Sequence, residues 1–321
     1  MDNMADNIDL LSLNCRGLRN KTKRRTLFSW LEKYNRAIIM LQETHSDASI
    51  EQIWSNEYKG KIYFSHGSSN SRGVALLLPR ANQNFTLNIK DVKSDDDGRI
   101  LLVDTEVENN PLVFLNVYAP TKDNVDFQNN FLENLVTIVG NYSDKPMIIG
   151  GDFNTYLDSK LDKKGGISEP NSSYTSNLIN FIEEYALVDI WRKRNKNKPQ
   201  FTWRGKSRMG LIQSRLDYFF VSMSLESEVI NAAISPSIGS DHSLVSLSFS
   251  IKNTSRRGNS FWKFNNILLK DPDYIKMVKA IIQDAILENP FNNNSLLWEY
   301  IKCRVRTETM TYSSRRAKEK N

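Results

Sequence analysis

The chain has 321 residues, and its 43 Lys and Arg against 37 Asp and Glu give a formal charge of +6. Hydrophobic residues make up 40% of the sequence, a normal globular value that excludes a collagen-like or wholly disordered chain. No run approaches the roughly 18 apolar residues that a membrane span needs, and the acidic, polar start is unlike a secretory signal. Two cysteines cannot form a disulfide framework, which suits a reducing compartment.

The positive charge is not spread evenly along the chain. Residues 252–321 hold 14 basic and 7 acidic residues, a net charge of +7, whereas residues 1–251 hold 29 basic and 30 acidic residues, a net charge of −1. The overall sign therefore does not by itself predict nucleic-acid binding, because local clusters of charge decide what a surface attracts.

Short runs rich in β-branched and aromatic residues recur through residues 8–250. Continuous apolar runs such as 37–41 and 112–115 are typical of strands covered on both faces, whereas the alternation in 243–250 is typical of a half-buried strand. We expect about nine or more strands, among them Ile8–Asn14, Ala37–Glu43, Gly73–Pro79, Ile100–Val107, Leu112–Pro120, Pro146–Asn154, Arg215–Ser222, Val229–Ser235 and Leu244–Ser250.

Apolar residues at helical spacing predict amphipathic helices between the strands, at Lys21–Tyr34, Asn124–Val139 and Ser172–Tyr185. Many strands with few helices favour two packed sheets with helices outside over a single doubly wound sheet. The predicted fold is therefore of the α/β (α+β) class: a four-layer α/β/β/α sandwich of two mainly antiparallel sheets, with a helical C-terminal extension.

The composition changes after a polar segment, Lys252–Asn259. Amphipathic helices are predicted beyond it at Asp273–Glu288 and Ser295–Arg306, in a piece of about 60 residues that is too small to bury a core alone. We predict that residues 1–251 form one domain and that residues 252–321 are a linker and helical connector.

Several polar residues stand next to the apolar strands, where a rigid strand end can fix a side chain. If these ends converge, they form a rim with carboxylates, an imidazole, a phenol and two amides. Each residue alone has an ordinary explanation, since Gly-Gly-Asp is a common turn and a lone His is more often structural. The candidates are Asn14, Glu43, Tyr118, Asp152, Asn154, Asp217, Asp241 and His242.

Seven short motifs occur in order along residues 8–250: LLSLNCR (10–16), LQET (41–44), NVYAP (116–120), GGDFN (150–154), FTW (201–203), RLDY (215–218) and SDHSLV (240–245). In this order they resemble the exonuclease–endonuclease–phosphatase superfamily, which includes apurinic/apyrimidinic endonucleases. They resemble more closely the endonuclease domain of LINE-type (non-LTR) retrotransposons. The resemblance implies that residues 1–251 form an endonuclease domain.

The resemblance implies a role for each motif residue. It implies that Glu43, with Asn14 beside it, holds a divalent metal, Mg²⁺ with Mn²⁺ as a substitute. It implies that Asp152 orients or deprotonates the attacking water, and that Asn154 and Tyr118 contact the phosphate.

Further roles follow from the last motifs. The resemblance implies that His242 places its imidazole on the scissile phosphate, with Asp217 and Asp241 as nearby carboxylates. Thr202 and Ser240 are implied contacts to the DNA backbone.

These roles agree with what phosphodiester hydrolysis requires: a nucleophilic water, and stabilisation of charge on the phosphoryl and leaving oxygens. Mg²⁺ prefers oxygen ligands and keeps several waters, so one or two carboxylates suffice. A carboxylate near His242 would raise its pKa and favour the charged imidazolium. The sequence argues for one metal and leaves two-metal operation open.

One position departs from the apurinic/apyrimidinic endonuclease pattern. There, the residue two after the first-strand Asn is usually acidic, whereas this chain has Arg16, which cannot ligate a cation. Arg16 therefore argues against abasic-site repair, suits the retrotransposon branch and is predicted to face DNA phosphate.

Two stretches hold only basic charges: Arg16–Arg25 has six basic residues and Arg192–Arg215 has nine. Each could be an ordinary solvated surface, but both adjoin site motifs, so we expect them to hold phosphates on either side of the scissile bond.

The segment Arg204–Ser214 is predicted to be a β-hairpin loop. In the resembling endonucleases this loop enters the minor groove and helps to choose the target. Arg204 and Arg208 are predicted DNA contacts and Met209 a wedge between bases. A mobile surface loop is the alternative.

The resemblance implies an enzyme that nicks one strand of double-stranded DNA and leaves a 3′-hydroxyl for target-primed reverse transcription. The reverse transcriptase domain of the same polyprotein, absent from this chain, is an expected partner reached through residues 252–321. Element RNA is a further candidate partner, and no membrane is expected. Action in the nucleus after synthesis in the cytoplasm is implied.

Three other functions compete with this prediction. Abasic-site repair is disfavoured by Arg16, and a lipid or inositol phosphatase is disfavoured by the basic stretches, which suit a long polyanion. A non-catalytic nucleic-acid binder with a degenerate site is disfavoured because every motif residue is present.

Overall fold

The computed structural model describes residues 6–34, 36–79, 86–121, 125–166, 172–208, 210–251, 266–288 and 294–319. The chain divides into two compact units, Met1–Ser260 and Phe261–Asn321, which we call the N-terminal and C-terminal units. Each unit is described by itself.

The first sheet of the N-terminal unit has six strands, of which only the edge strand β3 is missing from the sequence prediction. Strands β1 and β2 pair in parallel, and the other neighbours pair antiparallel. The order across the sheet is β14 (Val229–Ser235), β15 (Leu244–Ile251), β1 (Asp6–Asn14), β2 (Ile38–Gln42), β4 (Val74–Leu78) and β3 (Lys61–Ser65).

The second sheet also has six strands. Here β7 and β8 pair in parallel, and the other neighbours pair antiparallel. The order is β10 (Leu187–Asp189), β13 (Asp217–Ser222), β8 (Met147–Asp152), β7 (Asn110–Tyr118), β6 (Ile100–Val107) and β5 (Leu87–Ser94).

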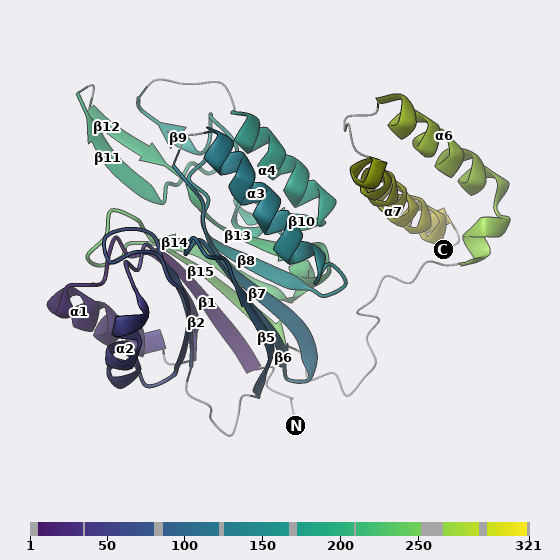
Figure 1. The fold of residues 1–321 in the computed structure, drawn as a ribbon. Helices are drawn as coiled ribbons and strands as arrows, with labels where there is room; N and C mark the ends of the chain where they lie inside the picture. The colour runs from purple at the N-terminus through teal and green to yellow at the C-terminus, as the bar shows by residue number, and fades with distance from the viewer. Residues whose placement is uncertain are drawn as a thin grey trace. The chain divides into compact units, whose positions relative to one another are not determined.

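Helices cover the outer face of each sheet (Figure 1). Helices α1 (Lys21–Leu31) and α2 (Glu51–Glu57) lie on the first sheet, and α3 (Val125–Gly140) and α4 (Ser173–Glu184) lie on the second. The described residues also include α5 (Ile190–Arg194) and the 3-10 helices Glu32–Tyr34, Ala48–Ile50, Met223–Glu228 and Asn266–Lys270.

Alternation along the strands builds the layers. In β1, Ile8 and Leu10 belong to the apolar core shared by the two sheets, whereas Leu11 and Leu13 pack with the residues of α1. A burial pattern of this kind needs apolar residues on both faces, which explains the continuous apolar runs. The four-layer sandwich predicted from the sequence is therefore confirmed.

Two buried amides join the sheets beneath the site. Gln42 of β2 donates to Asn116 Oδ1 of β7 at 2.7 Å, and Asn116 Nδ2 donates to the carbonyl oxygens of Leu41 and Ala75 at 3.0 and 2.8 Å. Buried polar groups need such partners, so these bonds fix the separation and register of the two sheets.

A small third sheet extends beyond the sandwich. Its strands β11 (Trp203–Ser207) and β12 (Gly210–Ser214) form an antiparallel hairpin, and β12 pairs with β9 (Lys163–Lys164). The hairpin that the sequence predicts in Arg204–Ser214 is thus present. We call residues 203–214 the hairpin.

The C-terminal unit consists of α6 (Pro272–Glu288), α7 (Asn294–Glu319) and a preceding 3-10 helix. Tyr274 and Tyr312 pack against each other with Leu268, and the Tyr274 hydroxyl bonds Thr309 at 2.7 Å. Both predicted helices are present, and α7 continues well beyond Arg306. The predicted linker Lys252–Asn259 lies outside the described residues.

Across the part of the chain that the structure describes, no helix is both long enough and apolar enough to span a membrane.

Candidate active site

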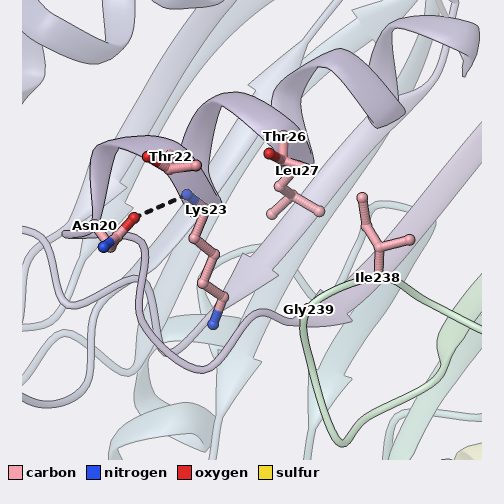
Figure 2. A pocket seen from close by; sticks show the side chains of 7 residues that line it. All are labelled: Asn20, Thr22, Lys23, Thr26, Leu27, Ile238 and Gly239. Carbon is pink, nitrogen blue, oxygen red and sulfur yellow. Dashed lines mark hydrogen bonds between the residues drawn. The ribbon is translucent and has the colours of Figure 1, made fainter.

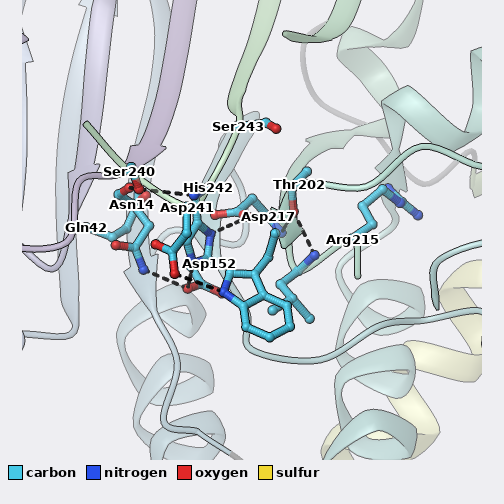
Figure 3. Close-up of polar contacts among 12 residues, drawn as sticks. Asn14, Gln42, Asp152, Thr202, Arg215, Asp217, Ser240, Asp241, His242 and Ser243 are labelled. Atoms are coloured by element: carbon cyan, nitrogen blue, oxygen red, sulfur yellow. Dashed lines mark hydrogen bonds and ion pairs between the residues drawn. The ribbon is translucent and has the colours of Figure 1, made fainter. Parts of the chain in front are cut away.

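The strand register brings the predicted site residues to one end of the sandwich. On the second sheet, Asp152 of β8 lies opposite Tyr118 of β7 on one side and Asp217 of β13 on the other. On the first sheet, Asn14 ends β1 opposite Gln42. We call Asn14, Glu43, Tyr118, Asp152, Asp217 and His242 the rim cluster. Figure 3 shows the contacts among four of its members, Asn14, Asp152, Asp217 and His242.

Asn14 joins two carboxylates from different sheets. Its Nδ2 donates to Glu43 Oε1 at 3.0 Å and to Asp152 Oδ2 at 2.9 Å. Its Oδ1 accepts from the backbone N–H of Arg16 at 3.0 Å. The amide is therefore placed to orient both carboxylates, and its position beside a metal stays a prediction.

The imidazole of His242 is held between two acids. Its Nδ1 lies 2.9 Å from Asp217 Oδ2, and its Nε2 lies 3.9 Å from Asp152 Oδ2. Because Asp217 engages Nδ1, Nε2 is the nitrogen turned toward Asp152 and the substrate side of the cluster.

Burial and neighbouring charge shift the pKa values of these groups. Burial and the nearby Asp217 carboxylate raise the pKa of Asp152, against the opposing effects of His242 and Asn14. Burial alone would lower the pKa of His242, but the hydrogen-bonded Asp217 outweighs it and raises that pKa. The pair Asp217–His242 is thus built to keep the imidazole charged.

The Tyr118 hydroxyl donates to Glu43 Oε1 at 2.8 Å. Burial and the adjacent Glu43 carboxylate raise the pKa of Tyr118, so the phenol keeps its proton and remains a donor. Arg99 braces the ring from the other side, with its guanidinium 5.2 Å from the ring centroid and its Nη1 donating to the Tyr118 carbonyl.

Backbone strain concentrates beside the cluster. Arg16, Glu43, His45 and Asn154 all have left-handed backbones, with φ of 50°, 49°, 52° and 49°. For residues other than glycine this conformation is unfavourable and persists only where the surroundings enforce it. The surrounding fold therefore imposes the backbone conformation at these positions and, with it, the direction in which each side chain leaves the backbone.

The donor set suits a hard divalent cation. Glu43 keeps one oxygen, Oε2, free of the bonds from Asn14 and Tyr118, and its side chain is 23% exposed, which leaves room for cation-bound waters. Ligand atoms of Asp152, Asp217 and His242 also lie within 4.8 Å of one another. However, Asp217 Oδ2 and His242 Nδ1 already bind each other at 2.9 Å, whereas Glu43 has an oxygen on the exposed side of the site, so Glu43 is the better anchor.

Two further site residues have other contacts. Asn154 donates its backbone N–H to Asp152 Oδ1 at 2.9 Å and its Nδ2 to the carbonyl of Ala119 at 2.7 Å. Asp241 accepts from Trp203 Nε1 at 3.3 Å and lies 3.4 Å from the guanidinium of Arg16. Asp217, rather than Asp241, is the carboxylate that holds His242.

A cavity of about 710 Å³ runs from the cluster to the hairpin. Its lining includes Glu43, Asp152 and His242 of the cluster, Trp203 next to His242, and Arg208 of the hairpin. A separate cavity of about 580 Å³ lies beside the start of α1, where Lys23 and Gly239 face each other (Figure 2). The first cavity links the chemistry to the hairpin; the second adjoins the first basic stretch.

The predicted DNA contacts fall into three groups. Arg16, Arg204 and Arg208 are exposed, and Arg204 donates to Ser243 Oγ at 3.1 Å. Ser240 is half-buried; its hydroxyl donates to the Asn14 carbonyl and accepts from the His242 N–H. Met209 lies outside the described residues.

Thr202 corrects the sequence prediction. Its side chain is fully buried, and its Oγ1 accepts the backbone N–H groups of Leu216 and Asp217 at 2.9 and 3.1 Å. A buried hydroxyl cannot meet the DNA backbone, so Thr202 instead fixes the strand that carries Asp217.

The two basic stretches also expose less charge than their sequences suggest. Arg24 is buried and pairs with Glu57 at 2.6 Å, and Arg215 is buried against Asp162 at 2.7 Å and Asp189 at 2.7 Å. Arg192 also pairs with Asp162. These three arginines are structural and are not part of a DNA-facing surface.

The sequence reasoning missed residues that act through others. Gln42 and Asn116 tie the sheets, Asp162 anchors Arg215, and Trp203 lines the cavity beside His242. Gln42, Asn116 and Trp203 lie inside the motifs LQET, NVYAP and FTW, so the sequence carried a signal for each of them, whereas Asp162 lies outside every motif and is identified only by its partner Arg215. His45, directly after LQET, was also passed over.

Comparisons with known proteins agree with this geometry. The profile of the Endonuclease/Exonuclease/phosphatase family matches residues 11–242. The transposon TX1 uncharacterized 149 kDa protein of Xenopus laevis is 32% identical over 273 residues, or 85% of this chain; the match spans only 20% of that protein. The exodeoxyribonuclease of Bacillus subtilis is 26% identical, with 75% of this chain and 99% of the relative covered.

Solved structures share the fold. AP endonuclease LMAP from Leishmania major superposes with a TM-score of 0.65 at 16% identity, covering 77% of this chain and 88% of that one. The Xenopus laevis APE2 catalytic domain gives 0.59 at 20% identity, covering 80% and 97%.

Proposed function

The chain belongs to the Endonuclease/Exonuclease/phosphatase family, and from that premise we propose that it is a Mg²⁺-dependent endonuclease that nicks one strand of DNA. The observation that carries the proposal is the rim cluster: two carboxylates bridged by one amide, beside an imidazole held by a third carboxylate. These are the groups that hydrolysis of a phosphodiester requires.

Asp152 accepts the proton of the attacking water. Its raised pKa makes it a stronger base than an ordinary carboxylate, and the donors Asn14 and Asn154 hold both of its oxygens in place. Proton transfer from water to Asp152 leaves a hydroxide that attacks phosphorus. The bond from phosphorus to the 3′-oxygen breaks, and that oxygen takes a proton from solvent to become the 3′-hydroxyl.

His242 stabilises charge on the phosphate. With Nδ1 fixed by Asp217, the charged ring donates through Nε2 to a phosphoryl oxygen that enters beside Asp152. Tyr118 holds Glu43 in place with its hydroxyl bond.

Glu43 is the residue that would hold the cation. A divalent ion bound there supplies positive charge to the phosphoryl and leaving oxygens. Glu43 needs only one free oxygen for this, because Mg²⁺ keeps most of its water ligands.

The DNA duplex would lie across the cavity between the cluster and the hairpin. Exposed Arg16 and Arg208 line that cavity and would contact phosphates on opposite sides of the nick. We keep the predicted contacts of Arg204, Ser240 and Met209 as part of this proposal.

The similarity to a transposon protein supports a role in target-primed reverse transcription. The nick would leave a 3′-hydroxyl that primes copying of element RNA by a reverse transcriptase in the same polyprotein. Residues 252–321 would connect to that enzyme, and the work would take place in the nucleus.

Conversion of supercoiled plasmid to open circles tests the activity. We expect nicking in Mg²⁺, none in EDTA, and extension of the nick by an added polymerase without end processing. Equal conversion by the wild type and by His242→Ala would defeat the catalytic assignment. Preference for an abasic duplex over an intact one would favour the repair alternative, against the argument from Arg16.

A further inference from the structure

The carboxylate of Glu43 faces an imidazole that the mechanism above does not use. Glu43 Oε1 is already occupied by the donors Asn14 and Tyr118, whereas Oε2 lies 3.8 Å from His45 Nε2. That distance is too long for a hydrogen bond. It lies within the span of roughly 3 to 4.2 Å between two ligand atoms of one cation, given metal–ligand distances of about 2.1 Å.

The fold builds a place for this ring. Gly17 packs against it so closely that a Cβ there would lie 2.7 Å from His45 Nδ1, and the φ of +80° at Gly17 independently favours glycine. A side chain at position 17 would displace the imidazole from Glu43.

The backbone that carries the ring is fixed from both flanks. The N–H of His45 donates to the Arg72 carbonyl at 2.9 Å, and the N–H of Gly17 donates to the Glu43 carbonyl at 2.7 Å. Both Glu43 and His45 have left-handed backbones, at φ of 49° and 52°. These bonds hold two strained residues so that their side chains face the same point.

From this geometry we propose that His45 is a second protein ligand when the cation at Glu43 is Mn²⁺, and that the site therefore binds Mn²⁺ more tightly than Mg²⁺, with either ion able to support the reaction. The proposal rests on the proposed function only in taking Glu43 as the cation anchor. An imidazole beside a carboxylate favours first-row transition ions, because Mg²⁺ takes oxygen ligands almost exclusively.

Electron spin-echo spectroscopy of Mn²⁺ bound to the whole chain tests the ligand directly. We expect modulation from a directly coordinated imidazole ¹⁴N, replaced by the ¹⁵N pattern when the wild-type protein carries ¹⁵N-histidine. His45→Gln should lose the signal, whereas His242→Gln and His66→Gln should keep it. The labelled wild type gives an answer even if a variant folds poorly.

Affinity measurements provide the second arm. We expect His45→Gln to weaken Mn²⁺ binding about tenfold or more, the scale of losing a ligand or its support, and to change Mg²⁺ binding much less. A wild-type spectrum without histidine nitrogen, while Glu43→Gln still abolishes Mn²⁺ binding, overturns the His45 ligand and leaves the proposed function standing. If Glu43→Gln leaves Mn²⁺ binding unchanged, both the His45 ligand and the assignment of Glu43 as the cation anchor in the proposed function are overturned.

Discussion

The rim cluster and the hairpin differ in how firmly the rest of the fold holds them in place. Asp152, Asp217 and His242 are almost wholly buried and bonded across both sheets, so several contacts define each position. The outer hairpin, by contrast, is exposed, and Leu211 is 54% exposed. The proposed chemistry, which needs side chains held within about half an ångström, lies in the rigid region, whereas the proposed contact with DNA lies on an exposed loop that can be replaced.

The two regions meet at one buried ion pair. Arg215 lies two residues before Asp217, the first residue of β13, and bonds Asp162, the residue immediately before β9, the strand that pairs with the hairpin. Its guanidinium lies 5.3 Å and 4.4 Å from the ring centroids of Trp191 and Tyr218. This pair therefore holds the base of the hairpin against the catalytic strand.

The largest expected effect comes from the rigid region. Asp152→Asn keeps the shape but removes the proton acceptor, so we expect nicking to slow about a thousandfold. The melting temperature should fall little or rise, because the substitution removes a carboxylate close to Asp217. Plasmid-nicking rates and thermal melts check this, and a loss below tenfold would mean that another group takes the proton.

Breaking the junction should cost stability. Asp162→Ala leaves Arg215 with a single carboxylate, Asp189, in a buried site, and we expect a loss of about 3 kcal/mol in the free energy of unfolding. Urea denaturation measures it. Lys160→Ala, on the same loop and exposed, serves as the matched control; equal losses from the two would remove the special role of the junction.

Tyr118→Phe tests how finely the cluster must be fixed. The change removes the hydroxyl bond to Glu43 but keeps the ring beside Arg99. We expect about a tenfold slower nicking rate and a higher cation concentration for half-maximal rate, because a hydrogen bond to a charged group contributes about 1.5–3 kcal/mol. An unchanged cation dependence would show that Glu43 needs no such support.

The smallest effect is expected at the hairpin tip. Arg208→Ala should weaken DNA binding slightly and reduce the slope of log affinity against log salt by about 1, while the chemical step stays unchanged. Binding titrations at several salt concentrations measure the slope. Lys196→Ala changes a basic residue on another loop and serves as the comparison. The same change of slope in both variants would show that Arg208 contributes only to the overall positive charge and makes no specific phosphate contact.

The sequence predicted the strands that carry the site because buried strands leave strong signals. AIIML (37–41) and LVFL (112–115) needed apolar residues on both faces, and the polar residues after such strands marked the rim. Weak signals hid the edge strands β3, β5 and β10, whereas the edge strand β14 was predicted. β5 (Leu87–Ser94) lies at a sheet edge with exposed Lys and Asn, and its alternation is interrupted by a bulge between Ile89 and Asp91.

Partners distant in sequence limited the prediction of surface charge. Arg24 and Arg215 stood in acid-free stretches, yet Glu57 and Asp162 reach them from elsewhere in the chain. Thr202 was mispredicted for the same reason. Its neighbours in the sequence do not reveal that its hydroxyl accepts the N–H groups of Leu216 and Asp217. A count of basic residues along the sequence therefore overstates the positive charge at the protein surface, because some of those residues are buried in ion pairs.

Replacing the tip of the hairpin tests the division between the two regions most directly. Residues 206–211 would be exchanged for a short Asn-Gly turn, and nick positions on one plasmid would be mapped by sequencing alongside total nicking rates. We expect a redistributed set of nick sites with a rate within about tenfold of the wild type. An unchanged set of sites, or loss of all nicking in a protein that folds normally, would contradict it.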